Sequence, residues 1–261
     1  MEVDEVSKSL FDLSGMTALV TGGGSGLGRD IAEVLAEHGA NIAVCSRKLN
    51  NCQETVEVIE RKYSVKAKAY ACDVSSEEDV NRTVEAVLAD FGQIDILVNN
   101  SGASWGESVE KMPIEAWQKV IGVNVTGTFL MSKAVGQQMI QNGYGKIINI
   151  GSIAGIRAES AKVLNAIGYS TSKAAVHHFT RDLAKKWAEH GITVNAIAPG
   201  FFETKMTKHI INEKRDILLK HNPMGKIGDV DSLKGTALFL ASKASDFVTG
   251  QIIAVDGGSA L

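Results

Sequence analysis

The chain has 261 residues, a net charge of −3 and 44% apolar residues, as expected of a globular protein with one large or two small domains. The slight negative charge gives no sign of recruitment to nucleic acid. No apolar run reaches the ~18 residues of a membrane span, and the acidic start, MEVDEVSKSLFDL, is unlike a secretory signal. Three cysteines, Cys45, Cys52 and Cys72, lack metal-ligand spacing, so we expect reduced, buried thiols in a cytoplasmic protein.

Short apolar or β-branched runs alternate with segments of helical spacing along the chain. The predicted strands are Thr17–Thr21, Asn41–Ser46, Lys66–Ala71, Ile94–Asn99, Lys146–Ile150, Thr193–Ala198 and Ile252–Val255. This alternation predicts an α/β fold, a doubly wound sheet of Rossmann type with about seven parallel strands and helices on both faces. No linker rich in proline, glycine or serine interrupts it, so we expect an N-terminal extension over 1–13 and a single domain over 14–261.

The first predicted strand runs into a glycine-rich turn, VTGGGSGLGRDIAEVLAEHG, and a helix that we expect to begin near Leu27 and to stop at Gly39. Glycines at such a turn let a phosphate approach the backbone, and the helix N-terminus offers free N–H groups. The spacing Gly22, Gly26, Gly28 departs from the common G-x-G-x-x-G. A tight turn that binds no nucleotide is therefore an alternative at this point.

The spacing T-G-x-x-x-G-x-G resembles the nucleotide loop of the short-chain dehydrogenases/reductases, and further motifs follow in that family's order. They are Asp73-Val74, NNSG over 99–102, Asn124, Ser152, Tyr169 and Lys173 in YSTSK, Pro199-Gly200, and DGG over 256–258. The likeness spans roughly residues 13–261 and is similar to the branch of 3-oxoacyl reductases and gluconate 5-dehydrogenase-like enzymes. It departs from the family at Ser101, where alanine is usual. A long stretch between Ser152 and Tyr169 predicts a small insertion beside the active site.

The resemblance implies that Asn124, Ser152, Tyr169 and Lys173 form the catalytic set. A phenol with a pKa of ~10 is a poor base at neutral pH, and we expect the Lys173 ammonium, one helical turn away, to lower the pKa of Tyr169. Tyr169 then gives a proton to a carbonyl oxygen, Ser152 holds that oxygen, and Asn124 anchors a water near the lysine. A Tyr-x-x-x-Lys pair by itself is usually a solvated pair. The order of all four residues is what favours catalysis.

The end of the second predicted strand, CSRK, bears on the choice of cofactor. NAD enzymes typically have an acidic residue there, whereas this chain has Ser46 and Arg47, which can bind a 2′-phosphate through charge-assisted hydrogen bonds. We therefore predict NADP(H), although a solvated helix start explains Arg47 and Lys48 as well. Ser25 lacks the positive charge of some NADP-preferring relatives, which weakens the predicted preference. The cofactor-binding residues implied by the resemblance are Gly22, Ser25, Gly26, Leu27, Gly28, Ser46, Arg47, Asp73, Val74, Asn100, Tyr169, Lys173, Pro199, Gly200, Phe202 and Thr204.

The six histidines show no H-E-x-x-H or Cys/His grouping, so we predict no metal site. His177, His178, His209 and His221 are interpreted as structural or surface residues. The chemistry implied by the resemblance needs no metal, because the tyrosine supplies the acid.

In the family, the segment after Pro199-Gly200 closes over the substrate, and here it reads FFETKMTKHIINEKRDILLKHNPMGK. Its apolar residues form either a lid or the core of a helix; they are Phe201, Phe202, Met206, Ile210, Ile211, Leu218 and Leu219. Lys and Arg outnumber Asp and Glu between 203 and 226. That excess suits an anionic partner, such as a phosphopantetheine thioester or a sugar acid, and a solvated helix face explains it equally well. Leu130 argues against an acyl carrier protein, because such reductases often carry arginine there.

Together these patterns predict an NADP(H)-dependent oxidoreductase that interconverts a ketone and a secondary alcohol by hydride transfer. The first expected substrate is a 3-oxoacyl (β-keto) thioester or a related carbonyl compound. A gluconate 5-dehydrogenase-like enzyme of sugar acids or polyols is the alternative, and a non-catalytic NADP(H)-sensing or scaffold protein is a remote one.

We expect no nucleic-acid or membrane partner. By analogy with the family we expect a homotetramer or homodimer with contacts through 114–141, 168–189 and 252–261. Phe129, Ala175 and Phe179 are apolar residues on the two helices concerned. Core packing explains these three residues equally well.

Overall fold

The computed structural model describes residues 10–204, 207–229 and 231–261. Seven strands form one sheet in the order β3-β2-β1-β4-β5-β6-β7, and every neighbouring pair is parallel. The strands are β1 (Thr17–Thr21), β2 (Asn41–Ser46), β3 (Ala67–Ala71), β4 (Ile96–Asn99), β5 (Gly145–Ile150), β6 (Ile192–Pro199) and β7 (Ile252–Val255). The predicted parallel, doubly wound sheet of seven strands is confirmed.

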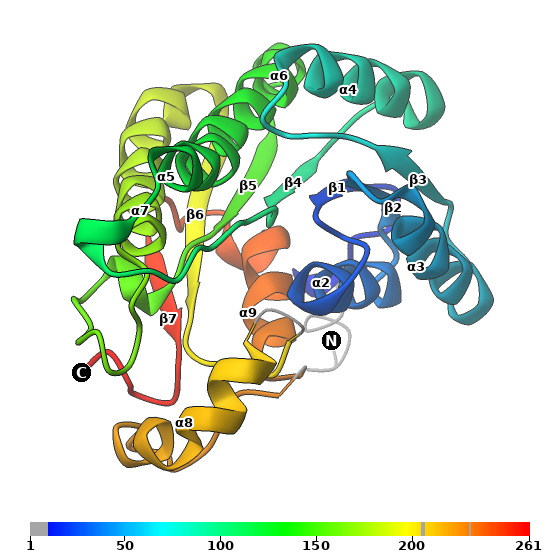
Figure 1. Ribbon diagram of the computed structural model, residues 1–261. Coiled ribbons are helices and arrows are strands. Elements are labelled where there is room, and N and C mark those ends of the chain that lie inside the picture. The colour runs from blue at the N-terminus through cyan, green and yellow to red at the C-terminus, as the bar shows by residue number, and fades with distance from the viewer. Residues whose placement is uncertain (1–9, 205–206, 230) are drawn as a thin grey trace.

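Helices cover both faces of this sheet (Figure 1). They are α2 (Gly26–Glu37), α3 (Leu49–Lys62), α4 (Glu77–Phe91), α5 (Ile114–Ile121), α6 (Gly127–Asn142), α7 (Ile167–Trp187), α8 (Lys208–Lys220) and α9 (Asp231–Ala241). In β1, Ala18 and Val20 join the apolar cluster formed with α2, α3 and α9, while Leu19 joins the one formed with α4, α6 and α7. A strand buried on both faces has no polar side, which is why the strands read as continuous apolar runs.

The predicted bounds hold for β1, β2 and β7 and shift by one or two residues elsewhere. The largest shift is at β4, which begins at Ile96 rather than Ile94. The Asp95 carboxylate accepts a hydrogen bond of 2.7 Å from the backbone N–H of Thr17, and the backbone N–H of Asp95 donates to the carbonyl of Thr17 at 2.9 Å, so side chain and backbone together join the strands where the sheet starts. Leu13 is fully buried, and its N–H donates to the carbonyl of His38 at 2.8 Å. The division into 1–13 and 14–261 stays a prediction, and residues 1–9 lie outside the described part.

The long helix predicted over 114–141 is interrupted. Between α5 and α6 the backbone makes a π-helical segment, Gly122–Thr126, which contains the buried Asn124. A π-helical turn inserts one residue into the helix, and such turns are frequent at functional sites. Apolar spacing on either side conceals it, because each part keeps a helical pattern.

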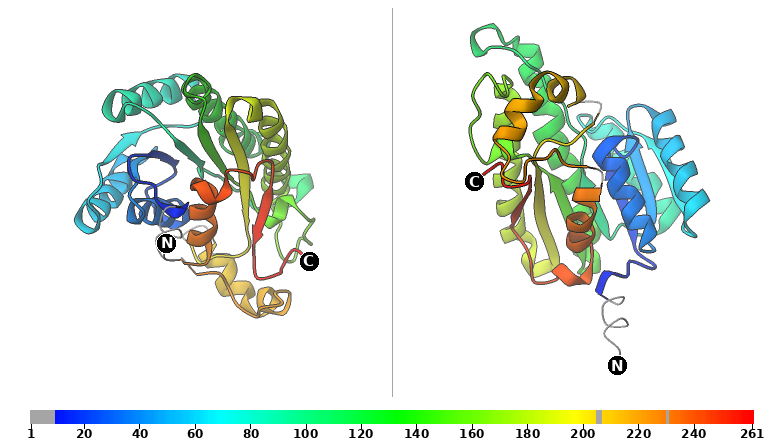
Figure 2. Two further views of the ribbon diagram at one scale, coloured as in Figure 1. Left: turned by 180° about the vertical axis from the view of Figure 1, so that it is seen from behind. Right: turned by 90° about the horizontal axis from the view of Figure 1, so that it is seen from below.

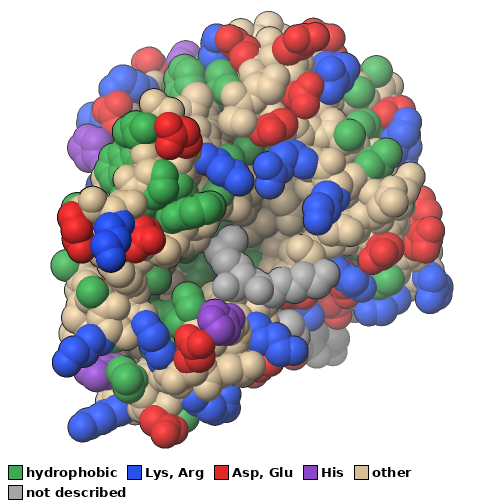
Figure 3. All heavy atoms as spheres, in the orientation of Figure 1, with side chains coloured by type: hydrophobic (Ala, Val, Ile, Leu, Met, Phe, Trp, Pro, Cys, Tyr) green, Lys and Arg blue, Asp and Glu red, His purple; other side chains and the backbone are tan. Residues whose placement is uncertain are grey.

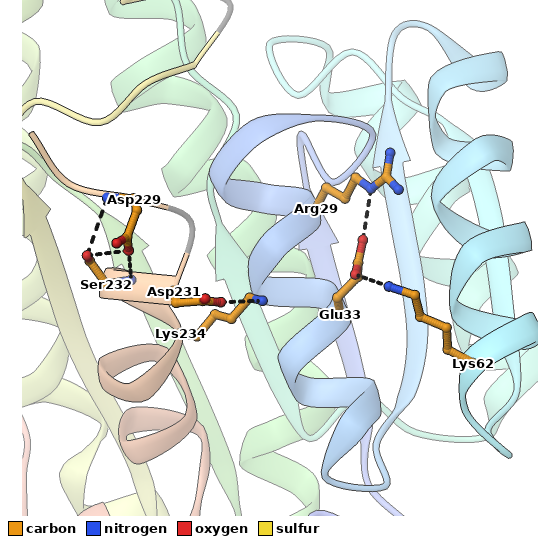
Figure 4. A network of polar contacts seen from close by, with 7 residues as sticks. All are labelled: Arg29, Glu33, Lys62, Asp229, Asp231, Ser232 and Lys234. Carbon is orange, nitrogen blue, oxygen red and sulfur yellow. Dashed lines mark hydrogen bonds and ion pairs between the residues drawn. The ribbon is translucent and has the colours of Figure 1, made fainter.

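Polar contacts on α2 lie at the surface (Figure 4). Glu33 accepts from Arg29 at 2.9 Å and from Lys62 of α3 at 3.2 Å. At the start of α9, the Asp229 carboxylate accepts from the backbone N–H of Ser232 at 2.9 Å and satisfies one of the free donors there. Exposed ion pairs contribute little to stability, so the apolar contact of α2 with α9 carries most of this packing.

The parallel strands all have their carboxyl ends at one edge of the sheet. There α8 and the segment 156–166 project side by side (Figure 2), and the Lys214 ammonium of α8 donates to the carbonyl of Val163 at 3.3 Å. Among the residues placed in the structure, no helix is long and apolar enough to cross a membrane. The same residues contain no cluster of three or more His, Cys, Asp or Glu that could hold a metal.

Candidate active site

A cavity of about 390 Å³ opens at this carboxyl edge, and Figure 3 shows the surface hollowed there. The predicted residues that line it are Gly22, Ser25, Gly26, Leu27, Ser46, Arg47, Asp73, Val74, Asn100, Ser152, Tyr169, Lys173, Pro199, Gly200, Phe202 and Thr204. Two predicted residues, Gly28 and Asn124, do not line it. The structure adds Cys72, Ser101, Gly102, Val123, Ile150, Gly151 and Thr207. Most of these lie beside a predicted residue in the chain, which is the one signal that could have found them.

The glycine-rich turn fits a pyrophosphate. Gly22 and Gly26 have φ of 63° and 55°, in the left-handed region that favours glycine. A Cβ on Gly28 would lie 2.2 Å from the Asn100 amide nitrogen, which donates to the carbonyls of Thr21 and Gly22 and braces the turn. The helix α2 begins there without a side-chain cap. Its first N–H groups therefore stay free for a phosphate.

Ser46 and Arg47, the residues predicted to hold the 2′-phosphate of the cofactor, both line the cavity. The Ser46 hydroxyl donates to the carbonyl of Lys48 at 3.0 Å and accepts from the Cys52 thiol at 3.2 Å. Its proton is thus already engaged, and the guanidinium is the main donor left. Arg47 is exposed, lines the cavity and forms no ion pair with any residue that the structure describes. This arrangement fits a dianionic phosphate.

The catalytic candidates come from two elements. Ser152 follows β5 and precedes the short helix η3 (Ile153–Gly155), while Tyr169 and Lys173 occupy neighbouring turns of α7. The Ser152 hydroxyl lies close enough to the Tyr169 phenol to lower its pKa. The Lys173 ammonium donates to the carbonyl of Ile150 at 2.7 Å and lies 5.6 Å from the centre of the tyrosine ring. The structure therefore brings three of the four predicted catalytic residues together.

Burial controls the protonation of this group. It raises the pKa of Tyr169 above its usual value, and the hydrogen bond from Ser152 only partly offsets that effect. Burial also lowers the pKa of Lys173 to about 8. Our expectation that the lysine leaves the tyrosine with a lowered pKa is wrong for the chain by itself, because desolvation is the largest influence on the phenol and raises its pKa. Tyr169 is a protonated phenol at neutral pH.

Asn124 is held behind the cavity wall by its own side chain. Its amide oxygen accepts from the backbone N–H of Ala103 at 2.7 Å, and its amide nitrogen donates to the carbonyl of Ala103 and to the Ser172 hydroxyl at 2.8 Å. These bonds tie the segment after β4 to α7 beside Lys173. The amide is fully engaged in positioning, and the predicted role of Asn124 in a water path stays a prediction.

The segment after Gly200 is packed rather than open. Ile211 and Leu218 are buried in α8, which favours the helix-core alternative for these two residues. Phe202 is also buried, but it precedes the helix and lines the cavity. Phe201, Ile210 and Leu219 are half-buried, and the predicted lid residue Met206 lies outside the described residues. Leu130 is also buried, so its side chain faces the interior and not a docking surface.

The family model described as enoyl-(acyl carrier protein) reductase matches residues 22–260, which hold all the ordered motifs. The chain belongs to the short-chain dehydrogenase/reductase family. It is 41% identical, over 95% of this chain and 96% of the relative, to the 2-dehydro-3-deoxy-D-gluconate 5-dehydrogenase of Bacillus subtilis. It is 37% identical, over 94% of this chain and 98% of the relative, to the 3-oxoacyl-[acyl-carrier-protein] reductase of Aquifex aeolicus.

Among solved structures of the short-chain dehydrogenases/reductases, the gluconate 5-dehydrogenase of Burkholderia cenocepacia in complex with NADP and tartrate has a TM-score of 0.91 and 36% identity, over 97% of this chain and 98% of that one. The predicted cofactor and reaction class are confirmed. This short-chain dehydrogenase/reductase uses NADP(H) and interconverts a carbonyl group and an alcohol.

The double variant Ser46→Asp/Arg47→Ile should invert the cofactor preference. A hydrogen bond to a charged group contributes about 1.5–3 kcal/mol, so Arg47 supplies a preference for NADPH of roughly ten- to hundredfold. The new carboxylate accepts from the ribose of NADH and repels the phosphate. The measurement is kcat/KM for both cofactors with one ketone. Arg61→Ile, an exposed arginine further along α3, is the control; a double variant that still prefers NADPH would contradict the assignment.

Lys173→Met should change how stability depends on pH. The folded chain holds the lysine pKa at about 8, below the ordinary 10.5. Between these values the unfolded chain keeps a proton that the folded chain lacks, so the contribution of Lys173 to the free energy of unfolding rises as the pH rises from 8 to 10.5. Urea unfolding at pH 7.5 and 9.5 should show that the free energy of unfolding of wild type, relative to that of the variant, is higher at pH 9.5. A difference between the two proteins that is independent of pH would show that Lys173 is not desolvated.

Proposed function

We propose that this chain reduces the ketone of a 3-oxoacyl thioester with NADPH. The observation that carries the proposal is the protonation of Tyr169: desolvation raises the pKa of its phenol, so the phenol beside Ser152 is neutral at pH 7 and holds the proton that a ketone oxygen needs. Ketone reduction requires a proton at the oxygen, whereas alcohol oxidation requires a base. The site of the chain by itself is therefore prepared for reduction.

Each residue of the site has a separate task in this scheme. NADPH supplies the hydride when it is bound. The Ser152 hydroxyl orients the ketone oxygen toward the phenol of Tyr169, which gives its proton to that oxygen. The Lys173 ammonium, held by Ile150, stabilises the negative charge left on the tyrosine, and its charge counts for more because the site is desolvated.

Apolar side chains near the catalytic residues support a substrate with an apolar chain. Ile156 follows η3 and is 46% exposed, and Ile167, two residues before Tyr169, is 41% exposed. Trp105 is 45% exposed and lies in the segment that pairs with 165–166 through Glu107. Figure 3 shows apolar side chains gathered on one side of the hollow and lysines and arginines on the other. Apolar side chains on one side of the hollow suit an acyl chain, and the cations on the other side suit an anionic carrier joined to it.

A sugar acid is the second candidate, favoured by the 41% identity to a relative named as a gluconate-type dehydrogenase. A sugar carboxylate would call for a free cation near the catalytic residues. The guanidinium of Arg157, five residues after Ser152, is instead 2.7 Å from the Glu159 carboxylate. We therefore place the thioester first. The assembled Ser152, Tyr169 and Lys173 argue against a non-catalytic sensor.

We also propose a homodimer or homotetramer located in the cytoplasm. Phe129 on α6 is 47% exposed in the single chain, and Phe179 on α7 is half-buried, which supports an interface through these two helices. Cys45, Cys52 and Cys72 are free thiols, which supports a reducing compartment.

A pair of substrates tests the proposal directly. Burying three or more methylene groups at about 0.8 kcal/mol each should favour 3-oxodecanoyl-N-acetylcysteamine over 5-ketogluconate. We expect a kcat/KM for NADPH-dependent reduction that is at least about tenfold higher for the thioester. The reverse order would assign the sugar acid, and no reduction of either compound would leave the thioester proposal without support.

Tyr169→Phe should lower the rate of ketone reduction by ~10²–10⁴-fold, the usual contribution of a general acid. The dissociation constant for NADPH, measured by fluorescence titration, should stay within about twofold, because the lost hydroxyl faces the ketone. Tyr63→Phe, which removes a phenol hydroxyl at the end of α3, is the control and should keep the full rate. A Tyr169→Phe enzyme with more than a tenth of the wild-type rate would exclude the tyrosine as proton donor.

A further inference from the structure

His177 lies on the same face of α7 as the two catalytic residues. Tyr169, Lys173 and His177 are spaced by four, so they occupy successive turns above the end of β5. The side chain of His177 is buried, with 5% of the residue exposed, whereas the neighbouring His178 is exposed. Both histidines are predicted from the sequence to be structural or surface residues. His178 is a surface residue, whereas His177 is buried beside Ser152.

The imidazole of His177 touches the backbone that carries Ser152. Its Nε2 accepts a hydrogen bond of 3.4 Å from the backbone N–H of Ser152. The ring reaches this position because Gly151 has no side chain: a Cβ there would lie 2.1 Å from Nε2. On the other side, the N–H of Gly151 donates to the carbonyl of Ile197 in β6 at 2.7 Å. The turn into the serine is thus held between a strand and an imidazole.

The bond requires a neutral ring with its proton on Nδ1, since Nε2 must accept. Burial lowers the pKa of His177 to about 4; the backbone of Gly155 raises it by hydrogen bonding, and the cations of Lys173 and Arg181 lower it further. The ring is neutral over the physiological range and becomes cationic only in acid. A protonated Nε2 would then point its N–H at the N–H of Ser152, and the bond would be lost.

We infer that His177 is a positioning residue for the reduction: its imidazole fixes the backbone of Ser152, so that the serine hydroxyl faces Tyr169. The inference rests on the roles proposed above for Ser152 and Tyr169. The serine hydroxyl itself accepts from the N–H of Ala154 at 3.2 Å. The Ser152 carbonyl accepts from the N–H of Gly155 at 2.9 Å, and the imidazole supplies the contact to the one backbone donor of Ser152.

Three variants test this role with the 3-oxodecanoyl thioester and NADPH. His177→Leu keeps the volume and removes the acceptor, and it should lower kcat about five- to tenfold, the effect of one neutral hydrogen bond, with KM for NADPH unchanged. His177→Gln restores an acceptor through its amide oxygen and should recover kcat to within about twofold of wild type. His178→Leu, the exposed neighbour, should match wild type.

The pH profile supplies a readout that a merely structural role would not move. The wild-type kcat should fall as the pH drops below about 5, with a midpoint near the histidine pKa of about 4, and His177→Gln should lack that component. Two results would overturn the inference: a His177→Leu enzyme with at least half of the wild-type kcat, or a His177→Gln enzyme as slow as His177→Leu at equal thermal stability.

If His177→Leu does not fold, the fall in kcat at low pH is the deciding measurement. An identical fall in wild type and His177→Gln would exclude the imidazole as its cause. Failure of the proposed function is distinguishable, since the wild type itself would then not reduce the ketone.

Discussion

The hydrogen bond from the Lys173 ammonium to the carbonyl of Ile150, 2.7 Å long, places a cation inside the molecule, and the geometry of the active site depends on it. Only 5% of Lys173 is exposed. Removing such a charge from water is expensive unless it is bonded. The last carbonyl of β5 accepts this bond, and in doing so it fixes α7 against the edge of the sheet. Tyr169, one turn earlier, and Ser152, two residues beyond the strand, are brought together as a consequence.

Buried hydrogen bonds between side chains also hold β4, β5 and α7 together. The Asn99 amide at the end of β4 donates to the Asn149 side chain in β5 at 2.9 Å, and Asn149 donates to Thr180 of α7 at 2.9 Å. All three side chains are buried. The Asn99 amide oxygen has no partner among the described residues, but breaking the bonds of the amide nitrogens would leave further buried polar atoms unpaired, so these bonds favour one arrangement. The bonds thereby hold β4, β5 and α7 in place relative to one another.

The sequence alone predicts the sheet well and the protonation of the site poorly. Strands buried on both faces are recognisable as apolar runs, so β1 and β2 are predicted with the bounds that the structure shows. The motif residues that line the cavity are predicted from their order along the chain. The rise in the pKa of Tyr169 depends on how completely distant segments enclose the phenol, and spacing along one helix carries no such information. His177 is missed for a related reason: a histidine on a helix gives no sign of what its ring touches. The π-helical turn around Asn124 is concealed by intact helical patterns on both sides.

The central claim is that desolvation, rather than the neighbouring cation, sets the pKa of Tyr169 and keeps its phenol protonated. Labelling the tyrosine ring carbon that bears the oxygen with carbon-13 allows each phenol to be titrated by NMR, and the signal absent from Tyr169→Phe identifies the residue. The account predicts that this signal, in the protein without cofactor, titrates with a midpoint above the ordinary phenol value of 10. A titration with a midpoint near pH 7 would contradict it and would make Tyr169 a base held ready for alcohol oxidation.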